Sequence, residues 1–277
     1  MPTFRTPEGV TLHFEEAGKG VPVLLLHGLG SSGSDWEGVL PRLSAHHRVL
    51  VPDARGHGRS DKPAGAYGVA LFACDIAALC DGLGLTGVHV VGLSMGGMMG
   101  FQLAVDRPDL VRSLVVINSG PDMVPRTLRQ KLTFATRLLA LKVLGPRGLA
   151  KLLAPKLFPR PEQEALRKRA RESLGANDPD VYLRATRGLL GWSVLTRLKD
   201  VACPVLALHS ERDYTPQAQK QAYVDQLAKA RLQVLTDSGH AAPVDQPGQV
   251  VEAVEGFLRE VEADASATSR GRMSRPR

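Results

Sequence analysis

The sequence has few of the residues that would tie it to a disulfide scaffold, a membrane or a nucleic acid. Its 277 residues include only three cysteines, none with a partner at metal-ligand spacing, so we expect buried thiols, no disulfide framework and no metal site. Aromatic residues make up 5%, which leaves no evident surface for stacking bases. Apolar runs fall short of the roughly eighteen residues of a transmembrane helix, and the first residues lack a signal-peptide pattern. We therefore expect a cytoplasmic protein without a membrane span.

Positive charge is concentrated in one segment. The chain has a net charge of +7, but residues 121–199 alone contain 17 Lys or Arg against 6 Asp or Glu, which leaves the remainder negative. We interpret this segment as a solvated face of an inserted domain, with attraction of acidic substrates or of an acidic surface as the alternative. A nucleic-acid binder is a further hypothesis, but no recognition motif accompanies the charge, and we expect no nucleic-acid partner.

Strands and helices alternate along most of the chain. Short apolar runs typical of buried strands occur at 23–26, 49–51, 88–91, 114–117, 204–208 and 232–235, with helical patterns such as 67–83 between them. Segments 3–5 and 10–14 look like an antiparallel pair that precedes them. The alternation predicts βαβ units and an α/β fold, with a mostly parallel, twisted sheet flanked by helices.

About eighty residues between the strands at 114–117 and 204–208 contain no convincing strand. They show helical patterns at 127–144, at 161–175 and from 179, and the first of these has an apolar side made of Leu128, Leu132, Ala135, Leu138, Leu139 and Leu141. We predict a core of residues 1–120 and 200–262, and a helical cap of residues 121–199 over the sheet edge that excludes water and shapes a pocket. Residues 263–277 have too few large apolar residues to fold and are predicted to form a disordered basic tail.

A candidate nucleophile lies in the stretch from Gly92 to Gly96, which fits the pattern G-x-S-x-G directly after the strand at 88–91. In such a strand-to-helix turn the serine, here Ser94, is held in strained backbone above the sheet edge, and glycines leave room for the turn to close. The backbone N–H of Met95 would then lie at the start of the next helix, where it can face negative charge on a substrate oxygen. The pattern alone is a weak signal, because a glycine-rich turn with a solvated serine also fits it.

Candidates for a general base and for the acid that orients it follow Ser94 in the chain. Asp213 lies just past the strand at 204–208, and His240 follows the strand at 232–235. Because the carboxyl ends of parallel strands meet at one edge of a sheet, we expect the three side chains to converge there. Asp122, soon after the strand at 114–117, is an alternative acid.

With these residues the chain resembles the α/β-hydrolase family over about residues 10 to 260. The resemblance is carried by His27-Gly28, the segment 53–60, the turn around Ser94, Asp213 in an Asp-x-x-Pro context, and Gly239-His240. It implies an α/β-hydrolase fold with catalytic roles for Ser94, Asp213 and His240, and it favours Asp213 over Asp122. It also implies that the Leu29 N–H is a second oxyanion donor beside Met95, and that His27 shapes its loop without taking part in the chemistry.

Four large apolar side chains are candidates for the substrate pocket, namely Trp36, Met123, Leu138 and Trp192. Large aromatic residues at such positions also serve as packing residues, so the two tryptophans have this second interpretation. The leucines of the cap suit an uncharged acyl chain, whereas its arginines could receive a carboxylate. The sequence leaves both possibilities open.

One rival motif points elsewhere. The stretch from Gly28 to Gly33 fits G-x-G-x-x-G after a strand, and Asp53 ends the next strand as a possible ribose ligand, a combination typical of dinucleotide binding. That interpretation leaves Ser94, Asp213 and His240 unexplained. We therefore interpret Asp53 as a structural acid that ties down the loop after it.

The sequence thus predicts a serine hydrolase that cleaves a small-molecule carboxylic ester or lactone through an acyl-enzyme on Ser94, without a cofactor. Haloalkane dehalogenases and epoxide hydrolases of the resembled family use aspartate at this turn, so Ser94 argues against both. Enol-lactonases, carbon–carbon hydrolases and cofactor-free perhydrolases keep serine and stay as alternatives. A hypothesis of another class is a ligand sensor that turns over poorly and signals through the cap. The oligomeric state is left open.

Overall fold

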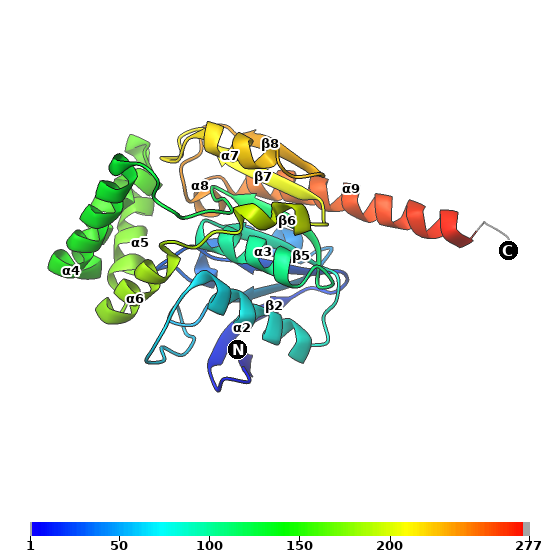
Figure 1. The fold of residues 1–277 in the computed structure, drawn as a ribbon, viewed down its shortest axis with the longest axis horizontal. Coiled ribbons are helices and arrows are strands. Elements are labelled where there is room, and N and C mark those ends of the chain that lie inside the picture. The colour runs from blue at the N-terminus through cyan, green and yellow to red at the C-terminus, as the bar shows by residue number, and fades with distance from the viewer. Residues whose placement is uncertain (1, 274–277) are drawn as a thin grey trace.

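A mostly parallel sheet of eight strands forms the centre of the molecule (Figure 1). The computed structural model describes residues 2–273. The strand order is β1-β2-β4-β3-β5-β6-β7-β8, in which β2 pairs antiparallel with β1 and β4, and all later pairs are parallel. The predicted α/β sheet is therefore confirmed. Its strands are β1 (Thr3–Arg5), β2 (Thr11–Ala17), β3 (Pro22–Leu26), β4 (Arg48–Pro52), β5 (Val88–Leu93), β6 (Val111–Ile117), β7 (Val205–Ser210) and β8 (Ala230–Leu235).

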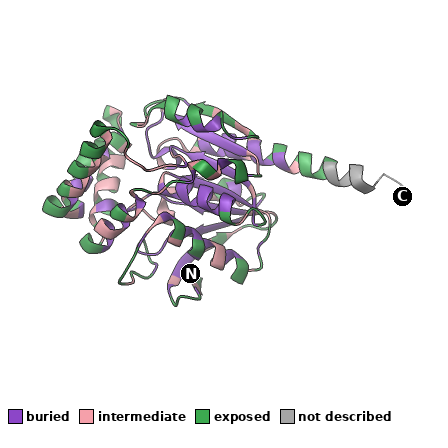
Figure 2. Cartoon of the chain, viewed as in Figure 1, coloured by how far each residue is buried: buried purple, intermediate pink, exposed green. Residues whose placement is uncertain are grey.

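Helices cover both faces of this sheet, and Figure 2 shows the strands buried between them. In β3, Leu24 and Leu26 belong to one apolar cluster with α2, α3 and α7, whereas Val23 and Leu25 belong to a second cluster with α1, α8 and α9. Successive side chains of a strand point to opposite faces, so a strand covered on both sides is a continuous apolar run. The helices are α1 (Leu40–Leu43), α2 (Val69–Gly82), α3 (Met95–Asp106), α7 (Gln217–Val224), α8 (Ala242–Asp245) and α9 (Pro247–Met273).

The segment between β6 and β7 forms three further helices beside one end of the sheet (Figure 1). These are α4 (Leu128–Leu157), α5 (Glu164–Gly175) and α6 (Pro179–Leu189). Short 3-10 turns follow α4 and α6, namely η2 (Pro161–Gln163) and η3 (Leu195–Asp200). A third 3-10 turn, η1 (Gly33–Trp36), follows β3 in the core. An isolated antiparallel bridge joins Asp122 to Ser193, and the Met123 N–H donates to the Trp192 carbonyl (2.8 Å). The segment thus leaves and re-enters the core at one place. We use "cap" for residues 121–199.

The side of helix α4 that is exposed to solvent differs from the prediction. Gly145 is non-helical (φ 65°, ψ −178°), so a kink divides α4 close to where the sequence predicts the first helix to end. The predicted apolar side is largely in solvent, however, because Leu128, Leu132 and Leu139 are 73%, 56% and 60% exposed, whereas Leu141 is buried. An amphipathic pattern defines two sides of a helix but does not say which side the rest of the chain covers.

Helix α9 runs into the segment that the sequence predicts to be disordered. It continues to Met273, and Ala263 to Ala267 are exposed on it, while residues 274–277 lie outside the described part of the chain. Alanine has the highest helix propensity, which favours continuation of the existing helix through this stretch. Within residues 2–273, no helix is long and apolar enough to cross a membrane.

The three cysteines are free thiols in different surroundings. Cys80 is buried as predicted, Cys203 is half-buried, and Cys74 is exposed on α2, which corrects the prediction for that residue. A helix that packs one side on a sheet leaves its outer positions in solvent, whatever the residue.

Candidate active site

Ser94 lies in the sharp turn between β5 and α3. Its backbone dihedral angles, φ 51° and ψ −111°, fall outside the regions that L-residues favour. Its N–H donates to the Ile117 carbonyl in β6 (2.9 Å), and its carbonyl accepts from the Ser119 hydroxyl (2.6 Å). Neighbouring chain segments therefore hold the strained turn in place.

Two glycines allow this turn to close. A Cβ on Gly92 would lie 2.3 Å from the Gly96 carbonyl carbon, and a Cβ on Gly96 would lie 2.1 Å from the Leu26 carbonyl oxygen in β3. Neither position can hold a side chain without moving backbone. The glycines flanking Ser94 thus have the packing role that the sequence pattern predicts.

The loop after β3 lies directly against the turn of Ser94. A Cβ on Gly28 would be 3.8 Å from the Ser94 Cβ. Within the described residues, neither the Leu29 N–H nor the Met95 N–H has a hydrogen-bond partner. His27 stabilises the loop, because its Nδ1 donates to the Gly28 carbonyl (2.8 Å) and its Nε2 accepts from the Ala54 N–H (3.0 Å). Two unpaired donors therefore stand near Ser94, while both nitrogens of His27 are already engaged.

His240 and Asp213 are in direct contact. The His240 Nδ1 lies 2.7 Å from the Asp213 Oδ1, and the exposed fractions of the two side chains are 7% and 0%. A carboxylate only accepts, so the proton is on Nδ1 and the Nε2 is left as an acceptor. The alternative acid, Asp122, is paired instead with Arg126 at the start of the cap.

Asp213 has a second buried partner that sequence reasoning missed. The Lys220 Nζ in α7 lies 2.7 Å from the Asp213 Oδ2, and the Lys220 side chain is 3% exposed. Burial alone would raise the pKa of Asp213, but the hydrogen bond and charge of His240 together with the Lys220 ammonium hold it well below its usual range. Burial lowers the pKa of Lys220 and the Asp213 charge opposes this. The buried carboxylate is thus ionised between two donors.

Tyr214 occupies the other nitrogen of His240. Its hydroxyl donates to the His240 Nε2 (3.1 Å), and the two rings stack with centroids 4.3 Å apart and an interplanar angle of 27°. No group within the described residues hydrogen-bonds to the Ser94 Oγ. The structure thus has Tyr214, and not Ser94, on the acceptor nitrogen. The only sequence signal for a role of Tyr214 at this site was its position next to Asp213.

Asn118 connects three strand ends at this edge of the sheet. It follows β6 with a positive φ of 48°, and its Nδ2 donates to the Ser210 Oγ (2.7 Å) and the His240 carbonyl (2.9 Å). Its Oδ1 accepts from the Ser210 N–H (2.8 Å). Sequence reasoning missed Asn118, although its position directly after an apolar strand is the same signal that identified Asp213.

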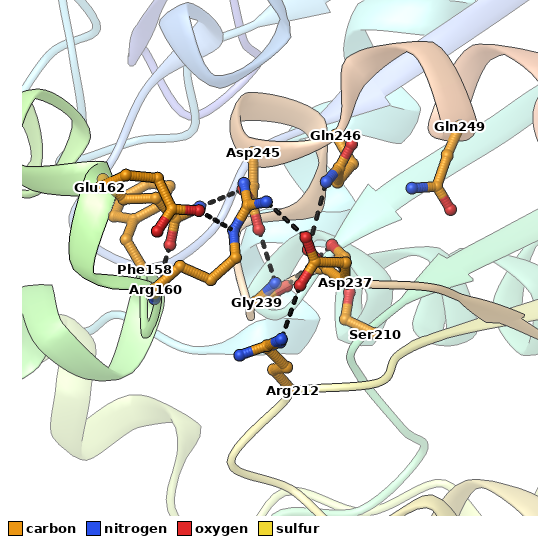
Figure 3. A network of polar contacts seen from close by, with 12 residues as sticks. Phe158, Arg160, Glu162, Ser210, Arg212, Asp237, Gly239, Asp245, Gln246 and Gln249 are labelled. Atoms are coloured by element: carbon orange, nitrogen blue, oxygen red, sulfur yellow. Dashed lines mark hydrogen bonds and ion pairs between the residues drawn. The ribbon is translucent and has the colours of Figure 1, made fainter.

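A network of charges joins the cap to the loop of His240 (Figure 3). Arg160 of the cap places its Nη2 3.0 Å from the Asp245 Oδ1 and its Nη1 2.5 Å from the Asp237 Oδ2. The other oxygen of Asp245 accepts from the Gly239 N–H (2.6 Å), one residue before His240. The backbone that carries His240 is therefore fixed partly from the cap.

A cavity of about 1060 Å³ extends from Ser94 and His240 to the inner sides of α4 and α5. Met123, one of the four pocket candidates, is among the residues that line it. Trp36 is a correction, because it is fully buried in the core cluster that includes α8 and α9 and is not among the residues that line the cavity. Leu138 and Trp192 are corrections too: α4 turns a different side to the cavity, and the Trp192 indole donates to the Gln102 side chain (2.7 Å) while packing on the core.

The structure explains the glycine motif from Gly28 to Gly33 without a dinucleotide. Asp53 is buried, and its two oxygens accept from the N–H groups of Gly33 (2.7 Å) and Arg59 (2.9 Å). These bonds tie the glycine loop to the loop after β4. The carboxylate proposed as a ribose ligand is therefore a structural acid.

Several known proteins are similar to this chain over most of their length. A family model described as "Alpha/beta hydrolase family" matches residues 23–253. A Caulobacter vibrioides protein, provisionally assigned as the carbamate hydrolase RutD, is 32% identical over 267 residues, which cover 92% of this chain and 97% of that protein. A thermophilic esterase from Thermogutta terrifontis is 27% identical with a TM-score of 0.85, covering 94% of this chain and 98% of its own. The enol-lactonase of Burkholderia xenovorans has the same fold, with 24% identity, a TM-score of 0.86, and coverage of 93% and 100%. The chain belongs to the alpha/beta hydrolase family.

Proposed function

We propose that this hydrolase cleaves carboxylic esters or lactones with Ser94 as nucleophile, His240 as general base and Asp213 as the acid that orients it. The observation that carries the proposal is that Ser94 and His240 line one cavity while Asp213 fixes the opposite nitrogen of His240 at 2.7 Å. A weak nucleophile next to an oriented base is the arrangement that acyl transfer requires.

The reaction follows from these atoms. The His240 Nε2 removes the proton of the Ser94 hydroxyl as its oxygen attacks the acyl carbon, and the Tyr214 hydroxyl must first leave that nitrogen. The N–H groups of Leu29 and Met95 stabilise the negative oxygen of the tetrahedral intermediate. His240 then protonates the leaving alcohol, and a water activated by the same nitrogen releases the acid from Ser94.

Initial rates on p-nitrophenyl esters from acetate to octanoate test the proposal, with γ-butyrolactone, an acyl-homoserine lactone and a phenyl carbamate in the same panel. The carbamate is included because of the RutD relative. Ser94→Ala should lower the turnover by about four orders of magnitude or more, because nucleophile and base act as a unit. Ser44→Ala, a change at the end of α1 remote from the cavity, should behave as the wild type.

Turnover that survives in a clean Ser94→Ala preparation would refute the mechanism. A folded wild type that turns over none of these substrates would instead favour carbon–carbon cleavage, perhydrolase chemistry or the ligand-sensor hypothesis. A fluorophosphonate probe separates these cases, since a covalent adduct on Ser94 in the wild type and none in Ser94→Ala reports an activated serine whatever the natural substrate.

A further inference from the structure

Before its kink at Gly145, helix α4 turns a basic stripe toward the cavity, whereas Leu128, Leu132 and Leu139 do not line it. Arg129, Thr133 and Arg137 are four residues apart, lie on one side of the helix, and all line the cavity. The exposed leucines at 128, 132 and 139 belong to other sides of α4. The cap therefore brings positive charge to the space above Ser94.

Arg137 differs from the other cations that line the cavity. Lys220 is paired with Asp213, Arg169 with Glu37 (2.6 Å) and Arg126 with Asp122. Arg129 has no acidic partner within the described part of the chain, but it lies in solvent. Arg137 is half-buried, and among residues 2–273 it has no acidic partner, while its Nε is buried without a hydrogen bond.

The acids around the cavity are already engaged. Asp35 accepts from the Ser31 hydroxyl (2.5 Å) and from a backbone N–H of the same loop, Asp122 pairs with Arg126, and Asp213 lies behind His240. A guanidinium partly removed from water without an acceptor is unfavourable, so the site is incomplete as it stands. An anionic group in the cavity would complete it.

Arg137 lines the same cavity as Ser94, Tyr214 and His240. The Tyr214 hydroxyl is in turn hydrogen-bonded to the His240 Nε2. An anion held by Arg137 would therefore lie in the same cavity as Ser94 and Tyr214.

We infer that Arg137 binds a carboxylate of the substrate, so that the preferred substrates are esters or lactones carrying a second, ionised carboxylate away from the reacting carbonyl. The planar guanidinium matches the two oxygens of a carboxylate. Arg129 adds favourable charge at the solvent side of the same stripe. This inference rests on the proposed function.

Two esters that differ only in charge test the inference. They are mono-4-nitrophenyl adipate, which keeps a free carboxylate, and its methyl ester, which is neutral. The quantity compared is the ratio of kcat/KM for the anionic ester to kcat/KM for the neutral one. Arg137→Gln should lower this ratio about ten- to a hundredfold, the range for losing a hydrogen bond between charged groups, mainly through KM. Arg137→Lys should lie between the two, and Lys142→Gln, an exposed change on α4 outside the cavity, should leave the ratio unchanged.

A ratio that stays the same in Arg137→Gln, with hydrolysis still dependent on Ser94, would overturn the carboxylate site alone. Ester hydrolysis that persists in Ser94→Ala would overturn the proposed mechanism instead. Binding of adipate to the Ser94→Ala variant by calorimetry needs no turnover. It should weaken at least tenfold on adding Arg137→Gln, and adipate binding of equal strength in both variants would refute the inference even if no ester is cleaved.

Discussion

The buried ion pair behind the candidate base makes Lys220 a residue whose removal should strongly destabilise the fold. Lys220 and Asp213 are 2.7 Å apart with exposed side-chain fractions of 3% and 0%. Lys220→Met keeps most of the side-chain volume but leaves the Asp213 carboxylate buried with one charge partner fewer. We expect a loss in the free energy of unfolding of about 3 kcal/mol, the low end of the range for breaking a buried pair, because His240 and the Thr215 hydroxyl still donate to Asp213.

A double-mutant cycle separates the pair from its surroundings. Asp213→Asn alone should also destabilise, since it leaves the Lys220 ammonium buried without its acid. The double variant should be more stable than the sum of the two losses by about 2 kcal/mol, because neither charge is then left alone. Lys229→Met, an exposed lysine after α7, is the control and should change stability by less than about 0.5 kcal/mol.

The loss of stability in Lys220→Met should become smaller at low pH. The pKa of Asp213 is lower in the folded protein than its ordinary value of 3.8, so its ionised form stabilises the fold above about that pH, and this contribution is lost as the pH falls through the lower folded value. In Lys220→Met the folded carboxyl is easier to protonate. The difference in stability between variant and wild type should therefore be at its full size near pH 7 and shrink as the pH falls below about 4.

Urea unfolding followed by circular dichroism at pH 7 and at pH 3 measures these values, with unchanged m-values as the check that only stability has changed. A loss below about 1 kcal/mol in Lys220→Met, or single losses that simply add in the double variant, would refute the reasoning. So would a penalty that grows on acidification.

Three further predictions concern single positions. Tyr214→Phe should raise kcat/KM for small esters about two- to tenfold, because the hydroxyl no longer competes for the acceptor nitrogen of the histidine; a tenfold loss would mean that the hydroxyl takes part in the reaction. Gly96→Ala should lower the melting temperature by about 5 °C or more, since its Cβ would meet a carbonyl oxygen at 2.1 Å, whereas Gly256→Ala on α9, where a Cβ meets nothing within 4 Å, should not lower it. In the native protein, Cys74 should react with a thiol reagent within minutes and Cys80 only after unfolding, because burial raises the pKa of Cys80 to about 12; equal reactivity of both thiols would contradict the packing of α2.

Much of the fold and the core of the candidate site follow from local sequence patterns. The strands are continuous apolar runs because both faces of the sheet are covered, and Ser94 is identified by the glycines that its turn requires. Asp213 and His240 are found because they follow strands whose carboxyl ends share one edge. In each case the physical constraint acts over a few residues.

What the sequence did not predict depends on contacts between distant segments. The leucines of α4 form an apolar side, yet the cap packs so that Arg137 faces the cavity and Leu139 faces solvent. Trp36 was a pocket candidate by its size, but only the packing of distant segments around it shows that it is a core residue. Lys220 looks like any surface lysine of an amphipathic helix until Asp213 is placed beside it.

The ion pairs of Arg160 with Asp245 and Asp237 matter for the design of chimeras in which the cap is exchanged (Figure 3). A cap exchanged between two family members along the natural boundary at β6 and β7 would remove a guanidinium that holds the backbone beside His240. The hybrid would then lose rate on every substrate alike, in addition to any change in preference. In a chimera of this protein, Arg160 therefore has to be kept together with Asp237, Asp245 and the loop of His240.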